Sequence, residues 1–453
     1  MDSYAERRGF NGTVLVARNG HVLLRKSYGT ASVNPPRANT PALRYRIGSL
    51  TKPLTATLVM QLVGQGQLKL DGTLGEYLPD LYAGTAAAPV TVAQLLSHTS
   101  GIADVPGRYD DPWWQTAAHE RWTPIDFARR WIKPEPVEIP GTKFRYNNNG
   151  FFLLGLIVER VTGKSYANNM RQRIFMPAEM GDSGVFTGAT PTGDFALGYA
   201  VSPAGQPMTP NLIDPSVSFS AAGLYSTVDD LLRFDRALYG TTILDSASRQ
   251  AMMTAHAGDY GYGWNVDNYA LPGGRTVPVV SHTGSVPGYQ SYYLRSERNR
   301  DCVIILDNHW QGMLVVQMGR DLIEVLNGKP MQRVKYSIDD LLTPIAYSQG
   351  PDAMVAAYDR LGSQAKDFDL SEGAFNTLGY KFLRNKKFAE AVQVFQWATH
   401  RFPQSANAFD SLGEAYRAAG MTAKAIENYE RALALDPRSK SAAAALTDLR
   451  RPR

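Results

Sequence analysis

Apolar and polar residues alternate with a period of two near both ends of the first 330 residues, which predicts β-strands there. Residues 13–28 form two such runs that meet at Asn19-Gly20, a dipeptide typical of a tight hairpin. A closing helix is expected at residues 313–326. Later alternating runs, set off by glycine and proline, predict four more strands, at residues 263–269, 277–282, 289–295 and 303–308.

Helical spacing of apolar residues dominates the part between these strands, from residue 50 to about residue 238. Leu54, Leu58 and Leu62 mark one stripe of its first helix, and a later apolar helix is expected to end at Gly163. The simplest architecture is α+β, with N- and C-terminal strands in one antiparallel sheet, helices flanking it and an all-α lobe inserted. A cleft between two such lobes is a favoured place for a ligand.

The C-terminal part of the chain repeats itself with a constant offset of 34 residues. Seven positions match in register: Phe375, Leu378, Gly379, Ala391, Phe395, Ala398 and Pro403 align with Phe409, Leu412, Gly413, Ala425, Tyr429, Ala432 and Pro437. This order and spacing are those of the tetratricopeptide repeat. Two repeats are few for independent stability, so a degenerate first unit is expected at 338–361 and a capping helix at 439–449. The chain is therefore divided into residues 1–330, a linker or degenerate helical repeat at 331–370, and an all-α repeat domain at 371–453.

Composition and charge exclude several classes of protein. A chain of 453 residues with 44% hydrophobic and 20% charged residues has a globular composition and is long enough for two or three domains. Residues 371–453 carry 13 of the 47 basic and 8 of the 42 acidic residues, so the net charge of +5 belongs to them. So mild an excess is typical of a solvated face, and neither a nucleic-acid partner nor a membrane span is expected. Cys302 is the only cysteine, which excludes an intrachain disulfide.

Ser49 and Lys52 lie three residues apart at the predicted start of the first helix. Residues at this spacing share one helix face, so the Ser49 hydroxyl and the Lys52 amine can meet. A serine hydroxyl needs a base to become a nucleophile, and a lysine in a dry pocket loses its proton readily enough to be that base. The helix N-terminus would also direct backbone N–H groups at an oxyanion. A surface turn is the alternative, because serine and lysine often occur at this spacing by chance.

The stretch around Tyr146 supplies the next candidates. The Tyr146 phenol can relay protons between Ser49, Lys52 and a leaving group, and the Asn148 amide can bind substrate or orient Lys52. A tyrosine beside three asparagines is also typical of a simple turn.

A third group of candidates lies at the end of a predicted strand. His282 can hydrogen-bond the Tyr146 hydroxyl, or it can be a capping or core histidine. Gly284 lets a substrate backbone approach closely, and the Ser285 N–H can join that of Ser49 in an oxyanion hole.

With these residues in view, the chain resembles the serine β-lactamase-like, penicillin-recognising hydrolases of the class C type. That family includes class C β-lactamases, DD-peptidases, D-aminopeptidases and the family VIII carboxylesterases. The resemblance spans about residues 9–330 and implies the β-lactamase/transpeptidase-like fold. Seven stretches carry it in the family's order: residues 11–20, 47–53, 95–101, 144–150, 222–227, 261–264 and 282–284.

The resemblance implies a role for each candidate. Ser49 would be the acylated nucleophile, Lys52 its proton acceptor, and Tyr146 the group that activates water and protonates the leaving group. The substrate-binding residues would be Asn148, Thr283, Gly284 and Ser285, with His282 supporting Tyr146 and Ser285 supplying an oxyanion N–H. His98, within residues 95–101, is expected to hold a loop together.

One departure from the family pattern bears on the activity. Class C β-lactamases carry a lysine at the position of His282, and a mostly neutral imidazole attracts a substrate carboxylate less well. This argues against a dedicated β-lactamase, but it does not choose among the esterases, DD-peptidases and D-aminopeptidases of the family, which can also carry histidine there. The first hypothesis is a serine hydrolase that forms an acyl-enzyme on Ser49 and acts as an esterase. A D-amino-acid-specific peptidase, a DD-peptidase or a weak β-lactamase are alternatives. A catalytically silent binding scaffold that works through its repeats is an alternative of another class.

No cofactor or metal site is expected, because the sequence holds no metal-ligand cluster, P-loop or dinucleotide fingerprint. It also lacks a G-x-S-x-G elbow, which argues against an α/β-hydrolase. The expected partners are an ester, amide or peptide substrate and a protein or peptide at the repeats. The compartment stays open: the resemblance implies the periplasm or secretion, while residues 1–6 show no signal peptide.

Overall fold

The computed structural model describes residues 1–105, 111–188, 193–202, 205–310 and 314–451. The chain forms two compact units. Residues 10–200 and 207–332 make the sheet unit, and residues 1–9, 201–206 and 333–453 make the repeat unit. The grouping of the nine N-terminal residues with the repeats has no counterpart in the sequence pattern. The division at residues 330 and 370 stays a prediction.

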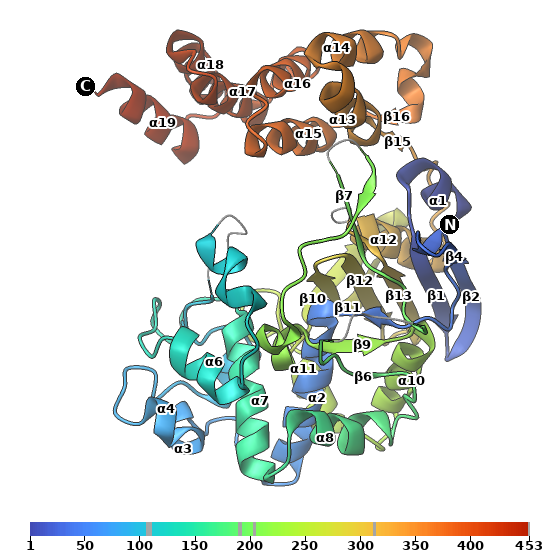
Figure 1. The fold of residues 1–453 in the computed structure, drawn as a ribbon, viewed down its shortest axis with the longest axis vertical. Coiled ribbons are helices and arrows are strands. Elements are labelled where there is room, and N and C mark those ends of the chain that lie inside the picture. Colours follow the sequence, from blue (N-terminus) through green and yellow to red (C-terminus); the bar gives the residue numbers. More distant parts are fainter. Residues whose placement is uncertain (106–110, 189–192, 203–204, 311–313, 452–453) are drawn as a thin grey trace. The chain divides into compact units, whose positions relative to one another are not determined.

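The sheet unit is built on six antiparallel strands in the order β10-β11-β12-β13-β1-β2 (Figure 1). The first strand pairs with the last one over its whole length, from Gly12 opposite Asp307 to Arg18 opposite Asp301. The expected sheet of N- and C-terminal strands is therefore confirmed. The strands are β1 Gly12–Arg18, β2 His21–Tyr28, β10 Asn265–Ala270, β11 Thr276–Val286, β12 Tyr289–Ser296 and β13 Asp301–Asp307.

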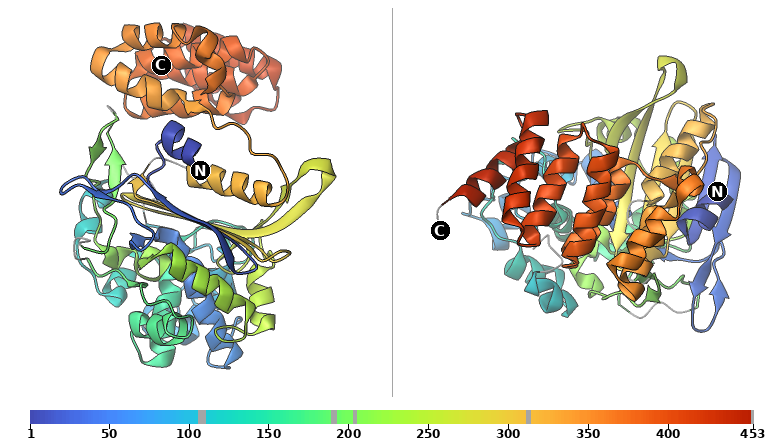
Figure 2. Two further views of the ribbon diagram at one scale, coloured as in Figure 1. Left: turned by 90° about the vertical axis from the view of Figure 1, so that its right-hand side faces the viewer. Right: turned by 90° about the horizontal axis from the view of Figure 1, so that it is seen from above.

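Helices cover both faces of this sheet because neighbouring residues of a strand point to opposite sides. Tyr292 of β12 packs against Gly319 of α12 (Leu314–Leu326). The next residue, Tyr293, donates a 2.8 Å hydrogen bond to Asp235 of α10 (Val228–Tyr239) on the other face. Figure 2 shows the two helices on opposite sides of the strands. The closing helix of the sheet unit was predicted to start at Met313, which lies outside the described residues.

The inserted helical lobe packs on the first helix, α2 (Thr51–Gly64). Sequence spacing assigned α2 a single apolar stripe, but eleven of its fourteen residues are buried. Polar Thr51, Lys52, Thr55 and Thr57 are among them, so α2 is enclosed on all sides. The other α-helices of the unit are α3 Leu74–Tyr77, α4 Pro79–Tyr82, α5 Val92–Leu96, α6 Pro124–Trp131, α7 Asn148–Thr162, α8 Tyr166–Met170, α9 Phe219–Ala222 and α11 Ser246–Met253.

Short strands fix the segments that border the start of α2. A three-stranded sheet has the order β5-β9-β6, with Arg46 of β5 opposite Tyr225 of β9. Elsewhere, β14 pairs in parallel with β7, placing His309 opposite Tyr199 and Trp310 opposite Ala200. These strands are β3 Thr30–Ser32, β4 Arg37–Ala38, β5 Tyr45–Arg46, β6 Gly184–Val185, β7 Tyr199–Val201, β8 Pro207–Met208, β9 Leu224–Ser226 and β14 His309–Trp310.

The repeat unit is a stack of antiparallel helix pairs (Figure 1). Two glycines 34 residues apart make the same contact in successive repeats: a Cβ on Gly379 would lie 2.4 Å from the Phe395 ring, and one on Gly413 would lie 2.9 Å from the Tyr429 ring. An α-carbon without a side chain is thus what lets each first helix accept the aromatic ring of the second. The elements are α1 Asp2–Arg8, β15 Tyr336–Ser337, α13 Ile338–Gln349, α14 Pro351–Asp359, β16 Phe368–Asp369, α15 Glu372–Arg384, α16 Phe388–Arg401, α17 Ala406–Ala418, α18 Thr422–Leu435 and α19 Lys440–Arg450.

Among the described residues, no helix has both the length and the apolar character needed to cross a bilayer.

Candidate active site

Ser49 and Lys52 meet at the start of α2. A short 3-10 turn, Gly48–Leu50, runs directly into the helix, so the two residues share one face of a continuous helical segment. The Lys52 Nζ lies 3.0 Å from the Ser49 Oγ. Ser49 is partly exposed, whereas Lys52 is fully buried. The lysine therefore approaches the serine from inside the protein and leaves the outer side of the hydroxyl open.

Lys52 Nζ has two further partners, and these decide how it is oriented. It donates to the Asn148 Oδ1 at 2.8 Å and to the Ala221 carbonyl oxygen at 3.1 Å. Both atoms can only accept, so they take two N–H bonds of the nitrogen. In the neutral amine the lone pair is then left for the third direction, toward the Ser49 hydroxyl.

Burial makes the neutral amine accessible. Desolvation lowers the pKa of Lys52 to about 7, while the negative charge of Asp104 acts in the opposite direction. The nitrogen lies over the aromatic rings of Tyr146 and Phe151, 4.7 and 5.7 Å from their centroids. No carboxylate of the described residues forms an ion pair with it. Near neutral pH, Lys52 can therefore both lose and regain a proton.

Asp104 holds the Asn148 amide in the orientation that Lys52 requires. One carboxylate oxygen accepts from the Asn148 Nδ2 at 3.0 Å, which turns Oδ1 toward the lysine. Asp104 also accepts from the backbone N–H groups of Asn148 and Asn149 at 3.2 Å each, at the start of α7. Asp104 was not among the residues predicted from the sequence. A carboxylate at a helix N-terminus is a common arrangement, but nothing in the sequence links Asp104 to a helix that begins 44 residues later.

Tyr146 stands on the open side of Ser49. Its side chain is 39% exposed, yet its hydroxyl lies among protein groups, and desolvation raises its pKa above the ordinary value. A hydrogen bond with the Ser49 side chain opposes that shift. His98 packs on the Tyr146 ring at 4.4 Å between centroids, and its Nδ1 accepts the Asn147 N–H at 3.1 Å. His98 thus holds the Tyr146 loop, as expected.

His282 has another partner than the sequence suggested. Its Nε2 lies 3.0 Å from the Tyr260 hydroxyl, not against Tyr146, whose ring centroid is 6.0 Å from its own. Its Nδ1 lies 2.6 Å from the Thr283 carbonyl oxygen, which can only accept, so Nδ1 carries the proton and Nε2 accepts from Tyr260. Desolvation, together with the charge of Lys52, lowers the pKa of His282 to about 3. The imidazole is therefore neutral, and Tyr260 is a second residue that the sequence analysis missed.

Strand β11 brings the remaining candidates to the serine by backbone contact. A Cβ on Gly284 would lie 2.0 Å from the Ile47 carbonyl oxygen, and one on Gly48 would lie 2.7 Å from the Ser285 nitrogen. Only glycine fits at either position, and the fit places the Ser285 N–H beside the turn that carries Ser49. The Ser285 side chain is exposed and Thr283 is half-buried, so both border open space. The Ser285 Oγ also accepts a 2.9 Å hydrogen bond from the Trp310 indole, a neighbour not anticipated from the sequence.

In the described part of the chain, no three His, Cys, Asp or Glu side chains gather in a way that could hold a metal ion.

Comparison with known proteins gives two family matches. The family described as Beta-lactamase matches residues 1–326, and the Tetratricopeptide repeat matches residues 406–439. Penicillin-binding protein 4* of Bacillus subtilis (strain 168) is 29% identical over 326 residues, which cover 68% of this chain and 70% of that protein.

Two solved structures are also similar. The octameric penicillin-binding protein homologue from Pyrococcus abyssi is 29% identical, with a TM-score of 0.62 over 72% of this chain and 76% of that one. The D-amino acid amidase from Ochrobactrum anthropi SV3 is 27% identical, with a TM-score of 0.57 over 73% of this chain and 97% of that one.

Proposed function

Because the chain belongs to the Beta-lactamase family and is a serine hydrolase, we propose that it cleaves carboxylic esters through an acyl-enzyme on Ser49. The observation that carries the proposal is the environment of the Lys52 Nζ. Two acceptors, Asn148 Oδ1 and the Ala221 carbonyl, fix the nitrogen, and the Ser49 Oγ lies 3.0 Å away in the remaining direction. A catalytically silent scaffold would leave this arrangement without a purpose.

In the acylation step, Ser49 Oγ attacks the ester carbonyl carbon. Its proton passes to the neutral Lys52 amine, which becomes an ammonium with three acceptors already in place. The carbonyl π pair moves onto oxygen, and the backbone N–H groups of Ser49 and Ser285 are the donors proposed for that oxyanion. A nitrogen with a pKa near 7 suits this exchange, because it neither holds nor releases its proton too strongly at neutral pH.

Collapse of the tetrahedral intermediate breaks the bond to the alcohol, which leaves with a proton. We assign the delivery of that proton to the Tyr146 hydroxyl, which is re-protonated from Lys52. The raised pKa of Tyr146 keeps the phenol protonated and ready to donate. In deacylation the same residues act in reverse: a water loses its proton toward Tyr146 and Lys52, attacks the acyl carbon and releases the carboxylic acid and the Ser49 hydroxyl.

The neutral state of His282 supports an ester over a β-lactam. Class C β-lactamases carry a lysine at this position, where a permanent charge helps attract the substrate carboxylate. His282, with a pKa of about 3, offers no positive charge at any pH near neutrality. Its assigned role is to hold Tyr260 and the edge of the site beside Tyr146. We assign substrate contact to Thr283, whereas Gly284 is buried against Ile47 and lets β11 approach the Ser49 turn.

An amide next to a D-residue is the second candidate substrate. It is favoured by the likeness to a D-amino acid amidase, at 27% identity over 97% of that chain. The leaving nitrogen of an amide must be protonated more fully than the leaving oxygen of an ester. Amide hydrolysis is therefore the stricter test of Tyr146 as the proton donor.

A fluorophosphonate reagent tests the chemistry directly. Peptide mass mapping is expected to find the phosphonyl adduct on Ser49 in the wild type and none in Ser49→Ala. A panel of 4-nitrophenyl butyrate, a chromogenic cephalosporin and D-alanine 4-nitroanilide then ranks the substrates, with the ester expected first. A folded protein that takes no label at Ser49 would contradict the proposal. A higher kcat/KM on the D-amide than on the ester would favour the second candidate substrate.

For the repeat unit we propose a protein or peptide partner, the usual use of tetratricopeptide surfaces. A hollow of about 540 Å³ between its last helices is lined by three carboxylates, Asp410, Glu414 and Asp448, and one guanidinium. That guanidinium, of Arg417, lies 3.6 Å from Asp448, so the hollow keeps an excess of negative charge. Such a surface suits a basic peptide. A Glu414→Lys variant that retains full capture of the partner obtained with wild type would contradict this assignment.

A further inference from the structure

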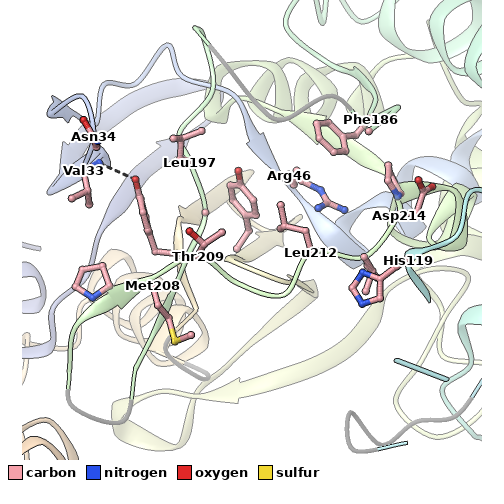
Figure 3. A pocket seen from close by; sticks show the side chains of 17 residues that line it. Val33, Asn34, Arg46, His119, Phe186, Leu197, Met208, Thr209, Leu212 and Asp214 are labelled. Carbon is pink, nitrogen blue, oxygen red and sulfur yellow. Dashed lines mark hydrogen bonds between the residues drawn. The ribbon is translucent and has the colours of Figure 1, made fainter. Parts of the chain in front are cut away.

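A cavity of about 600 Å³ lies in the sheet unit, and neither Ser49, Lys52, Tyr146 nor His282 lines it (Figure 3). Strand β5, the start of β12, the segment around His119 and parts of the stretch between Phe186 and Pro215 form its walls. Much of the wall is apolar, made by Phe186, Leu197, Met208, Leu212, Ile213 and Tyr289. No residue of this cavity has a part in the mechanism above.

Arg46 is the exception among these apolar walls. It comes from β5 and is 3% exposed, and its guanidinium makes no hydrogen bond or ion pair with any residue that the structure describes. The Nη2 atom is buried without a partner. One face of the guanidinium lies over the Phe186 ring, 4.7 Å from its centroid. Figure 3 shows the side chain in the middle of the cavity wall, between Phe186, Leu212 and Asp214.

The polar neighbours of Arg46 make their hydrogen bonds with other groups. The Asp214 Oδ1 accepts the Ser216 N–H at 2.8 Å, as the N-cap of a short turn. The Tyr289 hydroxyl donates to the Ala196 carbonyl at 2.8 Å, and the His119 Nε2 lies 3.0 Å from the Trp114 carbonyl. Asp214 and Tyr289 still act on Arg46 through space, but desolvation outweighs them and lowers its pKa. A buried cation in this condition favours an anion that can enter beside it.

We propose that this cavity binds a carboxylate carried on an apolar group, with Arg46 as the residue that recognises it. The guanidinium offers a planar fork of N–H donors that matches a carboxylate in two parallel hydrogen bonds. The apolar walls take the rest of the ligand, and a volume of about 600 Å³ is ample for an aryl or alkyl chain.

The position of Arg46 in the chain suggests where the carboxylate comes from. Three Cα–Cα steps separate it from Ser49, so the two α-carbons are at most about 11 Å apart. A substrate with its ester at Ser49 and an acidic end a few bonds away would reach the cavity. This substrate assignment rests on the proposed function; carboxylate binding as such does not, because a free carboxylic acid could occupy the same site.

Calorimetry tests the site without any catalysis. Ser49→Ala protein is titrated with 4-phenylbutyrate and with the neutral 4-phenylbutyramide, and the carboxylate is expected to bind at least tenfold more tightly. Adding Arg46→Met should remove that preference. Adding Arg44→Met instead, which deletes a cation paired with Asp182 at 2.7 Å, should keep it. Equal affinity for acid and amide, or a preference that survives Arg46→Met, would overturn the proposal.

A second variant covers the case in which Arg46→Met does not fold. Leu212 lines the same cavity and is 40% exposed, so Leu212→Glu introduces a negative charge there with little loss of folding stability. It is expected to weaken 4-phenylbutyrate binding at least tenfold, and unchanged binding would count against the site.

Kinetics then identify the source of the carboxylate. Mono-4-nitrophenyl esters of succinate, adipate and suberate are compared with neutral 4-nitrophenyl esters of equal length. If the carboxylate belongs to the substrate, one acidic ester exceeds its neutral partner in kcat/KM, and Arg46→Met lowers that ratio at least tenfold. If Arg46→Met keeps the kcat/KM ratio of acidic to neutral ester and loses only 4-phenylbutyrate binding, the ligand is a separate carboxylic acid. Absence of label on Ser49 alongside intact binding would defeat the proposed function and leave the carboxylate site standing.

Discussion

The start of α2 and the middle of β12 each bury a cation completely, but only one of them comes with its counter-charge. Arg295 on β12 is 0% exposed and donates from Nε to Asp235 Oδ1 at 2.8 Å, and the negative charge of Asp235 helps to raise its pKa. Lys52 on α2 is equally buried, yet its hydrogen-bond partners are a hydroxyl, an amide and a carbonyl, and its pKa falls to about 7.

The difference in hydrogen-bond partners distinguishes a structural cation from one that can take part in proton transfer. A buried charge beside a carboxylate is locked in one protonation state and can only hold the fold together. A buried amine among neutral acceptors keeps both states within reach, which is what a proton carrier needs. Removing a partner should therefore damage stability in one region and reaction rate in the other.

The largest effect is expected at the pair itself. Ser49→Ala and Lys52→Met should each lower kcat on 4-nitrophenyl butyrate by roughly 10³-fold or more, because nucleophile and base act as one unit. Lys69→Met removes an exposed lysine beyond the end of α2 and should leave kcat within a factor of two. A Lys52→Met enzyme with wild-type kcat would contradict the role of Lys52 as the base.

Next in size is the loss of the Arg295 counter-charge. Asp235→Asn removes the buried counter-charge and leaves Arg295 only the half-exposed Glu297 at 3.8 Å, so it should lower the free energy of unfolding by about 3–5 kcal/mol, measured by urea denaturation. On the same helix, Asp229→Asn breaks a partly exposed pair with Arg25 and should cost less than about 1 kcal/mol. Similar losses for the two variants would mean that burial does not distinguish these ion pairs.

The pH dependence of catalysis follows from Lys52. In the proposed mechanism the neutral amine is the active form, so kcat/KM should rise about tenfold per pH unit below pH 7 and level off above it. His282, with a pKa of about 3, stays neutral throughout and adds no second step. Because Asp104 raises the pKa of Lys52, Asp104→Asn should move the midpoint to lower pH. A flat profile between pH 5 and 8 would remove Lys52 from the role of base.

Lys52 also makes stability depend on pH, with a definite sign. The unfolded lysine keeps its proton up to its ordinary pKa of 10.5, whereas the folded one loses it near 7. Between these values the unfolded chain binds more protons, so Lys52 contributes stability that rises with pH across this window and is lost as pH falls toward 7.

The smallest effect concerns Arg46, the third buried cation of the sheet unit. It makes no ion pair or hydrogen bond with the described residues, and Asp214 acts on it only through space, so Arg46→Met should leave the ligand-free protein roughly 1 kcal/mol more stable, seen as a higher Tm. Arg44→Met, which breaks a partly exposed pair with Asp182, should change stability by less than that and not upward. A clear loss of stability in Arg46→Met would show that the cation–π contact with Phe186 outweighs desolvation.

Sequence patterns predicted the parts of this molecule that depend on local order. The 34-residue offset repeats the contact of Gly379 with Phe395 in Gly413 and Tyr429, so the repeats could be recognised from spacing alone. The alternation of residues at both ends of the sheet unit predicted that N- and C-terminal strands share one antiparallel sheet, and β1 does pair with β13. Ser49 and Lys52 share a helix face, and the contact between them follows from their spacing.

What the sequence did not predict depends on contacts between distant segments. Asp104 stands in a loop, and its bonds to Asn148 and Asn149 exist only because the fold brings that loop to the N-terminus of α7. Tyr260 takes the His282 nitrogen that sequence reasoning assigned to Tyr146, since both phenols are near and only the packing decides between them. Arg46 lies only three residues before Ser49, but the lack of a hydrogen-bond partner for its Nη2 is visible only in three dimensions.

The pairing of β1 with β13 also has a consequence for the order in which the protein is made. The hairpin of β1 and β2 leaves the ribosome early, yet the strand that covers the other edge of β1 begins only at Asp301. Throughout that interval a strand whose residues Val14, Leu15 and Val16 are at most 3% exposed in the finished fold presents an open apolar edge to the cell. The sheet unit therefore completes its core late in synthesis, and that edge is available for aggregation until then. The repeats, built from neighbours in sequence, carry no such delay.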